Sequence, residues 1–220
     1  MGNLVGIAGR LPVDAWCIEQ SAADEYLISL FGASEDALSA MQASWMDDET
    51  PKDMKYEVVD GVGVLAISGP MTRDPHCAMD YFGGTSTTLA KQALRKMSRD
   101  PLIESKKVIL AIDSPGGQVN GTEALAAEVN RLKAVGFEVV ASVNGLCCSA
   151  AYWIASQCDA IYANPTDTIG SIGTYMVVND YSAYYEKMGI KRHLIASGAH
   201  KGVGTPGIPI SKEQIAKLKD

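Results

Sequence analysis

The chain has 220 residues, of which 47% are hydrophobic, and it carries a formal net charge of −7 at pH 7. A chain of this length and apolar content can bury one substantial core, with a small appendage at one end. The acidic balance argues against a nucleic-acid partner, because nucleic-acid-binding proteins usually present a basic face, and it favours solubility.

Residues 1–55 are expected to form an N-terminal, partly helical arm and linker. Apolar residues recur at helical spacing over residues 22–38, and residues 46–53 form a charged segment that a proline interrupts. Residues 1–30 contain charged side chains throughout, so they lack the apolar core of a signal peptide. We therefore expect a cytoplasmic chain whose arm serves packing or assembly.

Residues 56–220 are expected to form one catalytic domain in which strands alternate with helices. This alternation indicates right-handed βαβ units and an α/β fold. Residues 58–67 are expected to form one strand or a hairpin, with a bend at Gly61 and Gly63. The further expected strands are residues 108–112, 139–143, 161–163, 174–178 and 192–196. The expected helices are residues 85–97, a helix capped by Thr122 and ended by Gly136, then 149–156, 180–188 and one beginning near Ser211.

An uncharged stretch covers residues 139–158. It includes serines, an asparagine, a glycine and a glutamine, which make it too polar for a lipid-exposed helix. We interpret it as a buried strand, a turn at Asn144-Gly145 and a buried helix, with no membrane span.

Ser149 is a candidate nucleophile at the predicted start of that helix. A hydroxyl there lies near unpaired backbone N–H groups and the positive end of the helix, which stabilise developing negative charge. The small neighbours Ala150 and Ala151 let a substrate backbone approach. A serine that only caps the helix is the alternative, and position alone favours it.

Gly116 and Gly117 lie between a predicted strand and a predicted helix. A glycine turn of this kind can direct a backbone N–H into a cleft with no Cβ in the way, as an oxyanion hole requires. An ordinary strand-to-helix turn explains the same pattern.

Lys201 lies in a stretch without acidic residues, since no Asp or Glu occurs between Lys187 and Lys212. A lysine amine acts as a general base at neutral pH only if its pKa falls from about 10.4 to roughly 7 or 8, and desolvation can produce such a shift. The sequence permits a desolvated amine here, while an exposed surface lysine is the commoner fate of a single lysine.

Cysteine and histidine suggest no metal or cofactor site. The five cysteines lack CxxC spacing, which suits a reducing compartment, and the three histidines form neither a Ser-His-Asp order nor a zinc signature. Cys148 with His200 is a thiol-protease alternative, although inert buried thiols are expected in so apolar a run.

Four segments in this order, IDSPGGQV, NGLCCSAAYWIAS, TIGSIGTY and LIASGAHKG, resemble the S49 serine peptidase family. That family includes signal peptide peptidase A and the head-protein proteases of tailed phages, and the resemblance runs from about residue 57 to the C-terminus. It implies a crotonase-like fold, similar to Clp protease and built from ββα units. It also implies that Ser149 is the nucleophile, that Lys201 is the general base and that Ser171 orients the lysine. The backbone N–H groups of Gly116, Gly117 and Ala150 would form the oxyanion hole.

Two features depart from the family pattern. Ser-Ala-Ala replaces the usual Ser-Gly-Gly at the nucleophile, which narrows the expected cleft. The chain also ends about twenty residues after Lys201, where family members continue, so a C-terminal truncation is expected.

The resemblance implies a serine endopeptidase that works through an acyl-enzyme, without a cofactor, in a homo-oligomeric ring. The soluble arm favours a phage-type protease that cleaves scaffold or capsid protein during head maturation, in the cytoplasm or within a prohead, with scaffold, capsid or portal proteins as partners. Three alternatives stay open. These are a soluble signal-peptide-peptidase-like protease that degrades apolar peptides, an inactive assembly or scaffold-binding module, and a crotonase-type acyl-CoA enzyme.

Overall fold

The structure is a computed structural model that describes residues 16–18, 53–75, 84–198 and 201–219. The chain divides into two compact units, residues 1–175 and 176–220. The helix expected at residues 22–38 lies outside the described residues, and the expected domain boundary at residue 55 stays a prediction.

The larger sheet of the first unit holds six strands of the described chain, in the order β10-β8-β6-β3-β2, with β9 also paired to β8. All the pairs are parallel except β2 with β3. The strands are β2 (Glu57–Val59), β3 (Val62–Ser68), β6 (Lys107–Ser114), β8 (Glu138–Cys148), β9 (Ala160–Tyr162) and β10 (Thr168–Gly170). The expected α/β fold with a parallel sheet is confirmed.

A smaller sheet lies beside it and has the order β1-β7-β4-β5 in the described residues. Its strands are β1 (Trp16–Ile18), β4 (Met71–Thr72), β5 (Thr85–Ser86) and β7 (Gly116–Gln118). Strand β1 is antiparallel to β7, and the other pairs are parallel. Two strands precede each long helix, β4 and β5 before α5 and β6 and β7 before α6, which agrees with the expected ββα units.

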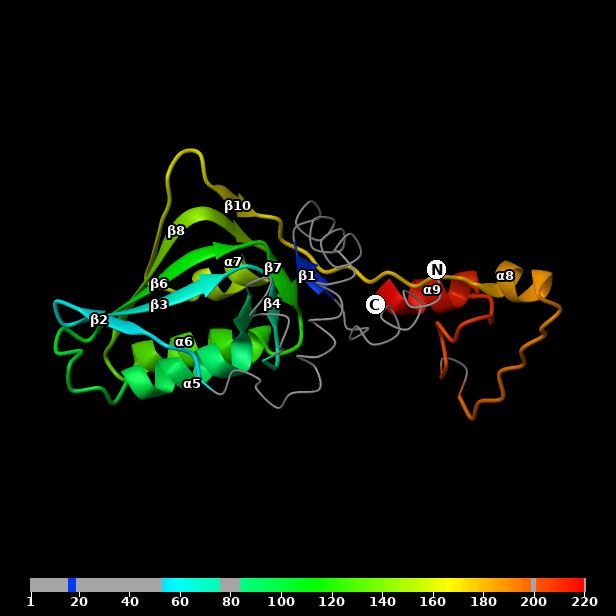
Figure 1. Cartoon of the computed structure of the whole chain (residues 1–220), viewed down its shortest axis with the longest axis horizontal. Helices are drawn as coiled ribbons and strands as arrows, with labels where there is room; N and C mark the ends of the chain where they lie inside the picture. The colour runs from blue at the N-terminus through cyan, green and yellow to red at the C-terminus, as the bar shows by residue number, and fades with distance from the viewer. Residues whose placement is uncertain (1–15, 19–52, 76–83, 199–200, 220) are drawn as a thin grey trace, which may run out of the picture. The chain divides into compact units, whose positions relative to one another are not determined.

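Three helices of the first unit cover one face of the six-stranded sheet (Figure 1). They are α5 (Thr87–Met97), α6 (Thr122–Ala134) and α7 (Ala150–Ala155). Alternate strand residues point at the helices and are fully or almost fully buried, as in β6, where they are Val108, Leu110 and Ile112. The residues between them, such as Ile109, are only partly buried. The all-apolar run of β6 predicts a strand buried on both faces, but in the described chain only one of its faces is covered.

The start of α6 differs from the prediction. Its N-cap is Gly121, at φ 94°, and Thr122 is already helical. The Thr122 hydroxyl donates to the carbonyl oxygen of Gln118 at 2.8 Å, so it ties the helix to β7. A Cβ on Gly121 would lie 2.3 Å from the Thr87 hydroxyl oxygen, so the close approach of α5 and α6 leaves no room for a side-chain cap there.

In the second unit the expected helices are confirmed as α8 (Ser182–Lys187), followed by Gly189 at φ 70°, and α9 (Lys212–Lys219). The strands expected at residues 174–178 and 192–196 are wrong. Strand β10 was not predicted. A strand needs a neighbouring strand to take its backbone hydrogen bonds, and a short apolar run does not reveal whether such a neighbour exists.

A buried carboxylate joins α5 to α6. The Glu128 side chain is 3% exposed and pairs with Arg95 at 3.0 Å and with Arg131, whose side chains are 55% and 40% exposed. The Arg95–Glu128 pair connects α5 to α6, and α6 also packs against α7. The ion pair therefore helps to hold the layer of helices that covers the sheet.

We predict that Glu128→Ala lowers the free energy of unfolding by about 2 kcal/mol, because it removes charge-assisted hydrogen bonds to a buried group. Both arginines keep contact with water, so the loss stays below that of a fully buried pair. Glu138→Ala is the control, since it removes an exposed ion pair with Lys107 and is expected to cost less than about 1 kcal/mol. Urea unfolding measures both, and equal losses would contradict the assignment.

Candidate active site

The carboxyl ends of three parallel strands meet at one edge of the larger sheet. At the end of β6, Ser114 pairs with Cys147 of β8, and at the end of β8, Cys148 pairs with Gly170 of β10. Each of the predicted site segments in the first unit follows one of these ends within a few residues. The structure therefore brings together the glycine turn after β6, Ser149 after β8 and the Gly-Ser-Ile-Gly segment at the end of β10.

Ser149 connects β8 to α7 with an unusual backbone conformation, φ 53° and ψ −114°. Residues with a side chain rarely adopt such a conformation, and it costs about 1–3 kcal/mol. Two backbone hydrogen bonds hold it: Ser149 N–H donates to the Gly170 carbonyl at 2.7 Å, and Trp153 N–H donates to the Ser149 carbonyl at 2.9 Å. A strained serine between a strand and a helix is the arrangement of many nucleophiles.

The Ser149 side chain makes no capping hydrogen bond to α7, so the alternative of a simple helix cap is not supported. Its hydroxyl instead donates to the Gly173 carbonyl at 3.4 Å, and the residue is 5% exposed. The serine oxygen thus lies against the segment that follows β10.

Two carboxylates shape the end of β8. The Leu146 N–H donates to Asp113 and the Gly145 N–H to Asp167, each at 3.0 Å. Gly145 has φ 116°, and a Cβ there would lie 2.6 Å from an Asp113 oxygen. The pairing of β6 with β8 shifts register at this point. The turn predicted at Asn144-Gly145 is therefore wrong, because the carboxylates keep the chain in the strand as far as Cys148.

Sequence reasoning missed both of these aspartates as residues that position the site. One available signal was the place of Asp113 directly before the Ser-Pro-Gly-Gly turn. Asp167 gives no local signal, since its partner Gly145 is 22 residues away.

Gly116 and Gly117 each have a structural reason to be glycine. Gly116 has φ 97°, and its N–H donates to the Ser114 hydroxyl at 3.2 Å. Gly117 passes so close to β4 that a Cβ would lie 1.9 Å from the carbonyl oxygen of Met71. Both glycines lie in strand β7, paired with its neighbours, so the strand-to-helix turn predicted at Gly116-Gly117 is wrong. The role of both residues in an oxyanion hole stays a prediction. The same holds for Ala150, the first residue of α7.

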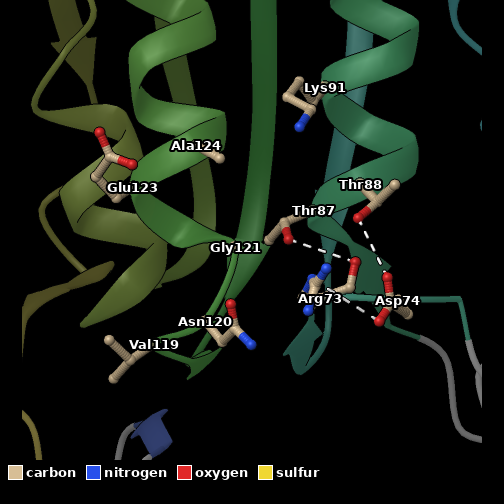
Figure 2. A pocket seen from close by; sticks show the side chains of 10 residues that line it. All are labelled: Arg73, Asp74, Thr87, Thr88, Lys91, Val119, Asn120, Gly121, Glu123 and Ala124. Atoms are coloured by element: carbon tan, nitrogen blue, oxygen red, sulfur yellow. Dashed lines mark hydrogen bonds and ion pairs between the residues drawn. The ribbon is translucent and has the colours of Figure 1, made fainter.

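A cavity of about 630 Å³ lies between the N-terminal ends of α5 and α6 (Figure 2). The charges of its lining residues balance, since Arg73 and Lys91 are positive and Asp74 and Glu123 are negative. Ser149 is not among the residues that line it. This cavity is therefore separate from Ser149.

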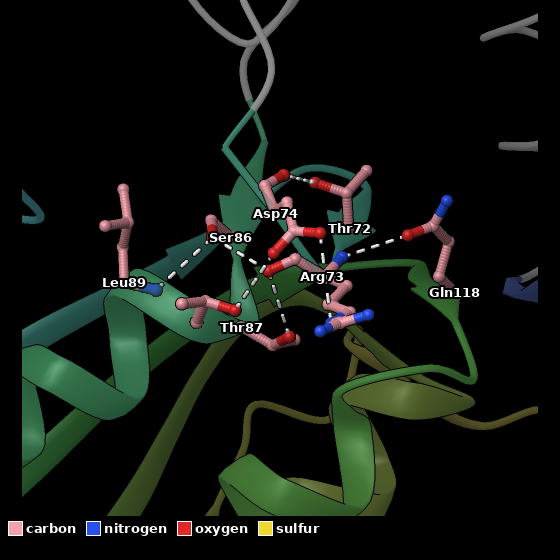
Figure 3. Close-up of polar contacts among 8 residues, drawn as sticks. Thr72, Arg73, Asp74, Ser86, Thr87, Leu89 and Gln118 are labelled. Atoms are coloured by element: carbon pink, nitrogen blue, oxygen red, sulfur yellow. Dashed lines mark hydrogen bonds and ion pairs between the residues drawn. The ribbon is translucent and has the colours of Figure 1, made fainter. Parts of the chain in front are cut away.

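The far end of β7 is anchored at Arg73 (Figure 3). The Arg73 N–H donates to the side-chain oxygen of Gln118 at 2.9 Å, and the Arg73 carbonyl accepts from the Ser86 hydroxyl at 3.0 Å and from the Thr88 N–H at 3.0 Å. Gln118 is 4% exposed. The strand that carries the glycine turn is thus tied to β4 and to the start of α5.

Ser171 has φ 49° and is exposed. It lies between Gly170 and Gly173, whose carbonyls accept hydrogen bonds from Ser149. The structure thus places it in the segment beside Ser149, and its action on a lysine stays a prediction.

Lys201 belongs to the second unit, where its N–H donates to the Gly198 carbonyl at 3.1 Å in a turn and its side chain is exposed. The two units are each described by themselves, so the pairing of Ser149 with Lys201 stays a prediction. His200, the partner in the thiol-protease alternative, lies outside the described residues.

Cys147 and Cys148 are buried core residues. Burial raises the pKa of the Cys147 thiol to about 12, and the buried Cys148 thiol donates to the Thr168 carbonyl at 3.5 Å. Both properties disfavour a thiolate nucleophile. Across the parts of the chain that the structure describes, no three His, Cys, Asp or Glu side chains group as metal ligands do, and none of the helices has the length and apolar character to cross a membrane.

Comparison with known proteins gives consistent matches. The sequence model of peptidase family S49 matches residues 131–220. Capsid assembly protease C of Escherichia phage lambda is 31% identical over 173 residues, which are 79% of this chain and 39% of the phage protein. Head-tail preconnector protein GP5 of Enterobacteria phage P21 is 34% identical over 146 residues, 66% of this chain and 28% of that protein.

A bacterial relative matches as well. Protease 4 of Salmonella typhi is 35% identical over 107 residues, 49% of this chain and 17% of that protein. The chain spans less than half of each of these three relatives. The resemblance to family S49 inferred from the four sequence motifs is confirmed by these matches.

The strain at Ser149 leads to a prediction about stability. Ser149→Gly is expected to be more stable than Ser149→Ala by about 1 kcal/mol, because glycine adopts the positive φ without the penalty that alanine keeps. Urea unfolding of the two variants measures the difference. An alanine variant as stable as the glycine variant would show that the backbone at this position is not strained.

Proposed function

We propose that this chain, whose residues 131–220 match peptidase family S49, is a serine peptidase with Ser149 as nucleophile and Lys201 as general base. The observation that carries the proposal is the strained backbone of Ser149 at the start of α7. The end of β8, which precedes this serine, pairs with the end of β6, which precedes Gly116 and Gly117. Strain of this kind is found at functional sites, where the surrounding structure enforces it.

The reaction proceeds through an acyl-enzyme. The neutral amine of Lys201 accepts the hydroxyl proton of Ser149 while the serine oxygen bonds to the scissile carbonyl carbon. The protonated lysine then gives its proton to the leaving amine nitrogen as the peptide bond breaks. A water molecule, deprotonated by the same amine, attacks the serine ester and releases the acid product and the free Ser149 hydroxyl.

Backbone N–H groups stabilise the tetrahedral oxyanion in this mechanism. The N–H of Ala150 suits the task because the first N–H groups of a helix have no acceptor within the helix. The second donor in this mechanism is the N–H of Gly116 or Gly117 in β7. The Gly116 N–H donates to the Ser114 hydroxyl in the structure, so it serves the oxyanion only once that hydrogen bond breaks. Ser171 accepts or donates a hydrogen bond at the lysine amine and so fixes its orientation.

The substrate class that the relatives favour is phage head protein. A capsid assembly protease and a head-tail preconnector protein are among the relatives, and their names concern head assembly. The chain is thus proposed to cleave scaffold or capsid protein during head maturation, as a homo-oligomer, in the cytoplasm or within a prohead. Protease 4 is a relative whose name indicates a protease without a phage role, so the alternative of a signal-peptide-peptidase-like protease that degrades apolar peptides stays open.

We predict that Ser149→Ala and Lys201→Ala each reduce kcat/KM for an unfolded protein or a quenched apolar peptide by about a thousandfold or more, since each removes one half of a cooperating pair. Lys191→Ala is the control, because it removes another exposed lysine of the same unit. It is expected to keep the parent activity. Parent-like turnover in the Ser149 or the Lys201 variant would refute the dyad.

A fluorophosphonate probe separates a peptidase from an inactive assembly module. The parent chain is expected to gain the mass of one phosphonyl group on the peptide that contains Ser149, because the activated serine oxygen bonds to phosphorus and HF leaves. The Ser149→Ala variant is expected to gain none. A folded parent chain that stays unlabelled would favour the assembly module.

A further inference from the structure

One segment of the N-terminal arm pairs with the strand that carries the glycine turn. Strand β1, Trp16–Ile18, lies antiparallel to β7, with Trp16 opposite Gln118, Cys17 opposite Gly117 and Ile18 opposite Gly116. It is the outer strand of the four-stranded sheet in the described residues. About 100 residues of chain separate the two strands, so this contact is not a local hairpin.

The edge of β7 that β1 covers leads to the candidate nucleophile. Gly116 lies two residues after Ser114, and Ser114 pairs with Cys147, which lies two residues before Ser149. Helix α7, which begins directly after Ser149, packs against β7. A strand that runs antiparallel to β7 therefore ends beside Gly116, at the end of β7 that lies toward the serine.

An extended polypeptide binds to the edge of a sheet through main-chain hydrogen bonds, and this mode needs a free edge. One edge of β7 pairs with β4 through Met71 and Gly117. The other edge pairs with β1. A second strand cannot pair with β7 while β1 occupies that edge, because each backbone N–H and C=O there has one partner strand.

We propose that Trp16–Ile18 occupies the edge where an extended polypeptide substrate docks, so that this segment competes with the substrate from within the chain. The inference rests on the proposed peptidase function, because it identifies the substrate as a strand that runs antiparallel to β7. Such a substrate presents the carbonyl of the residue opposite Gly116 nearest to Ser149. The residues before that carbonyl take the places of Trp16 and Cys17.

The competition is readily reversible because β1 has only three residues and therefore few ladder hydrogen bonds. A segment of the same chain nevertheless competes at a high effective concentration, because its binding is intramolecular. Short peptides then bind weakly until β1 leaves, while a long substrate with several docking residues displaces it more easily.

The test uses the full chain with Ser149→Ala, so that binding is measured without cleavage. The double variant Cys17→Pro/Ile18→Pro is compared with Cys17→Ala/Ile18→Ala. Successive N–H groups of a strand point to opposite edges, so one of the two prolines removes a donor that faces β7. The probe is a fluorescent synthetic peptide with the sequence of residues 13–22, and fluorescence anisotropy gives its Kd.

We predict that the proline variant binds this peptide about tenfold or more tightly than the alanine variant, because the internal competitor has gone. Of the neighbouring amides of Gly117 and Gln118, the one that faces β1 is expected to exchange faster with solvent deuterium in the proline variant, and the added peptide should slow it again. Circular dichroism establishes that both variants are folded. Ile18→Pro alone serves as a milder replacement if the double variant does not fold.

Equal Kd values for the two variants, or equal exchange at Gly117 and Gln118, would overturn the inference. Neither readout depends on catalysis. Tighter binding by the proline variant together with no hydrolysis by any chain that keeps Ser149 would contradict the proposed peptidase function and leave the docking edge intact.

Discussion

The strained backbone at Ser149 is the constraint on which the site depends. Parallel pairing of β8 with β6 and β10 brings the chain to the sheet edge, and the hydrogen bond from Ser149 N–H to Gly170 prevents it from relaxing. Asp113 and Asp167 hold the preceding residues of β8. A cost of about 1–3 kcal/mol persists only because these contacts together fix the backbone.

The residues of the four sequence motifs build the fold as well as the proposed chemistry. Gly117 is glycine because β4 passes too close for a side chain, and Gly145 because a carboxylate fills the space beside it. The same contacts bring the glycine turn, the serine and the end of β10 to one place. A motif that looks purely catalytic in the sequence therefore also determines how three strands end.

Much of the fold followed from local patterns. The helices at residues 87–97, 122–134 and 150–155 were predicted because apolar spacing and end signals act within one segment. Pairing between distant residues decides where strands form, and local patterns do not reveal it. The sequence therefore missed β10 and the continuation of β8 to Cys148, and it wrongly predicted strands at 174–178 and 192–196. The resemblance of four motifs to family S49 suggested which residues gather at Ser149, whereas the contacts of Asp167 and the pairing of β1 required the structure.

The most direct measurement is a crystal structure of the chain after reaction with a fluorophosphonate. The account predicts a phosphorus atom bonded to Ser149 Oγ, a phosphonyl oxygen that accepts hydrogen bonds from the N–H groups of Ala150 and the glycine turn, and Lys201 Nζ within about 2.6–3.2 Å of Oγ, from the same or a neighbouring chain. A label on another residue, or a lysine amine far from Oγ in every chain, would contradict it.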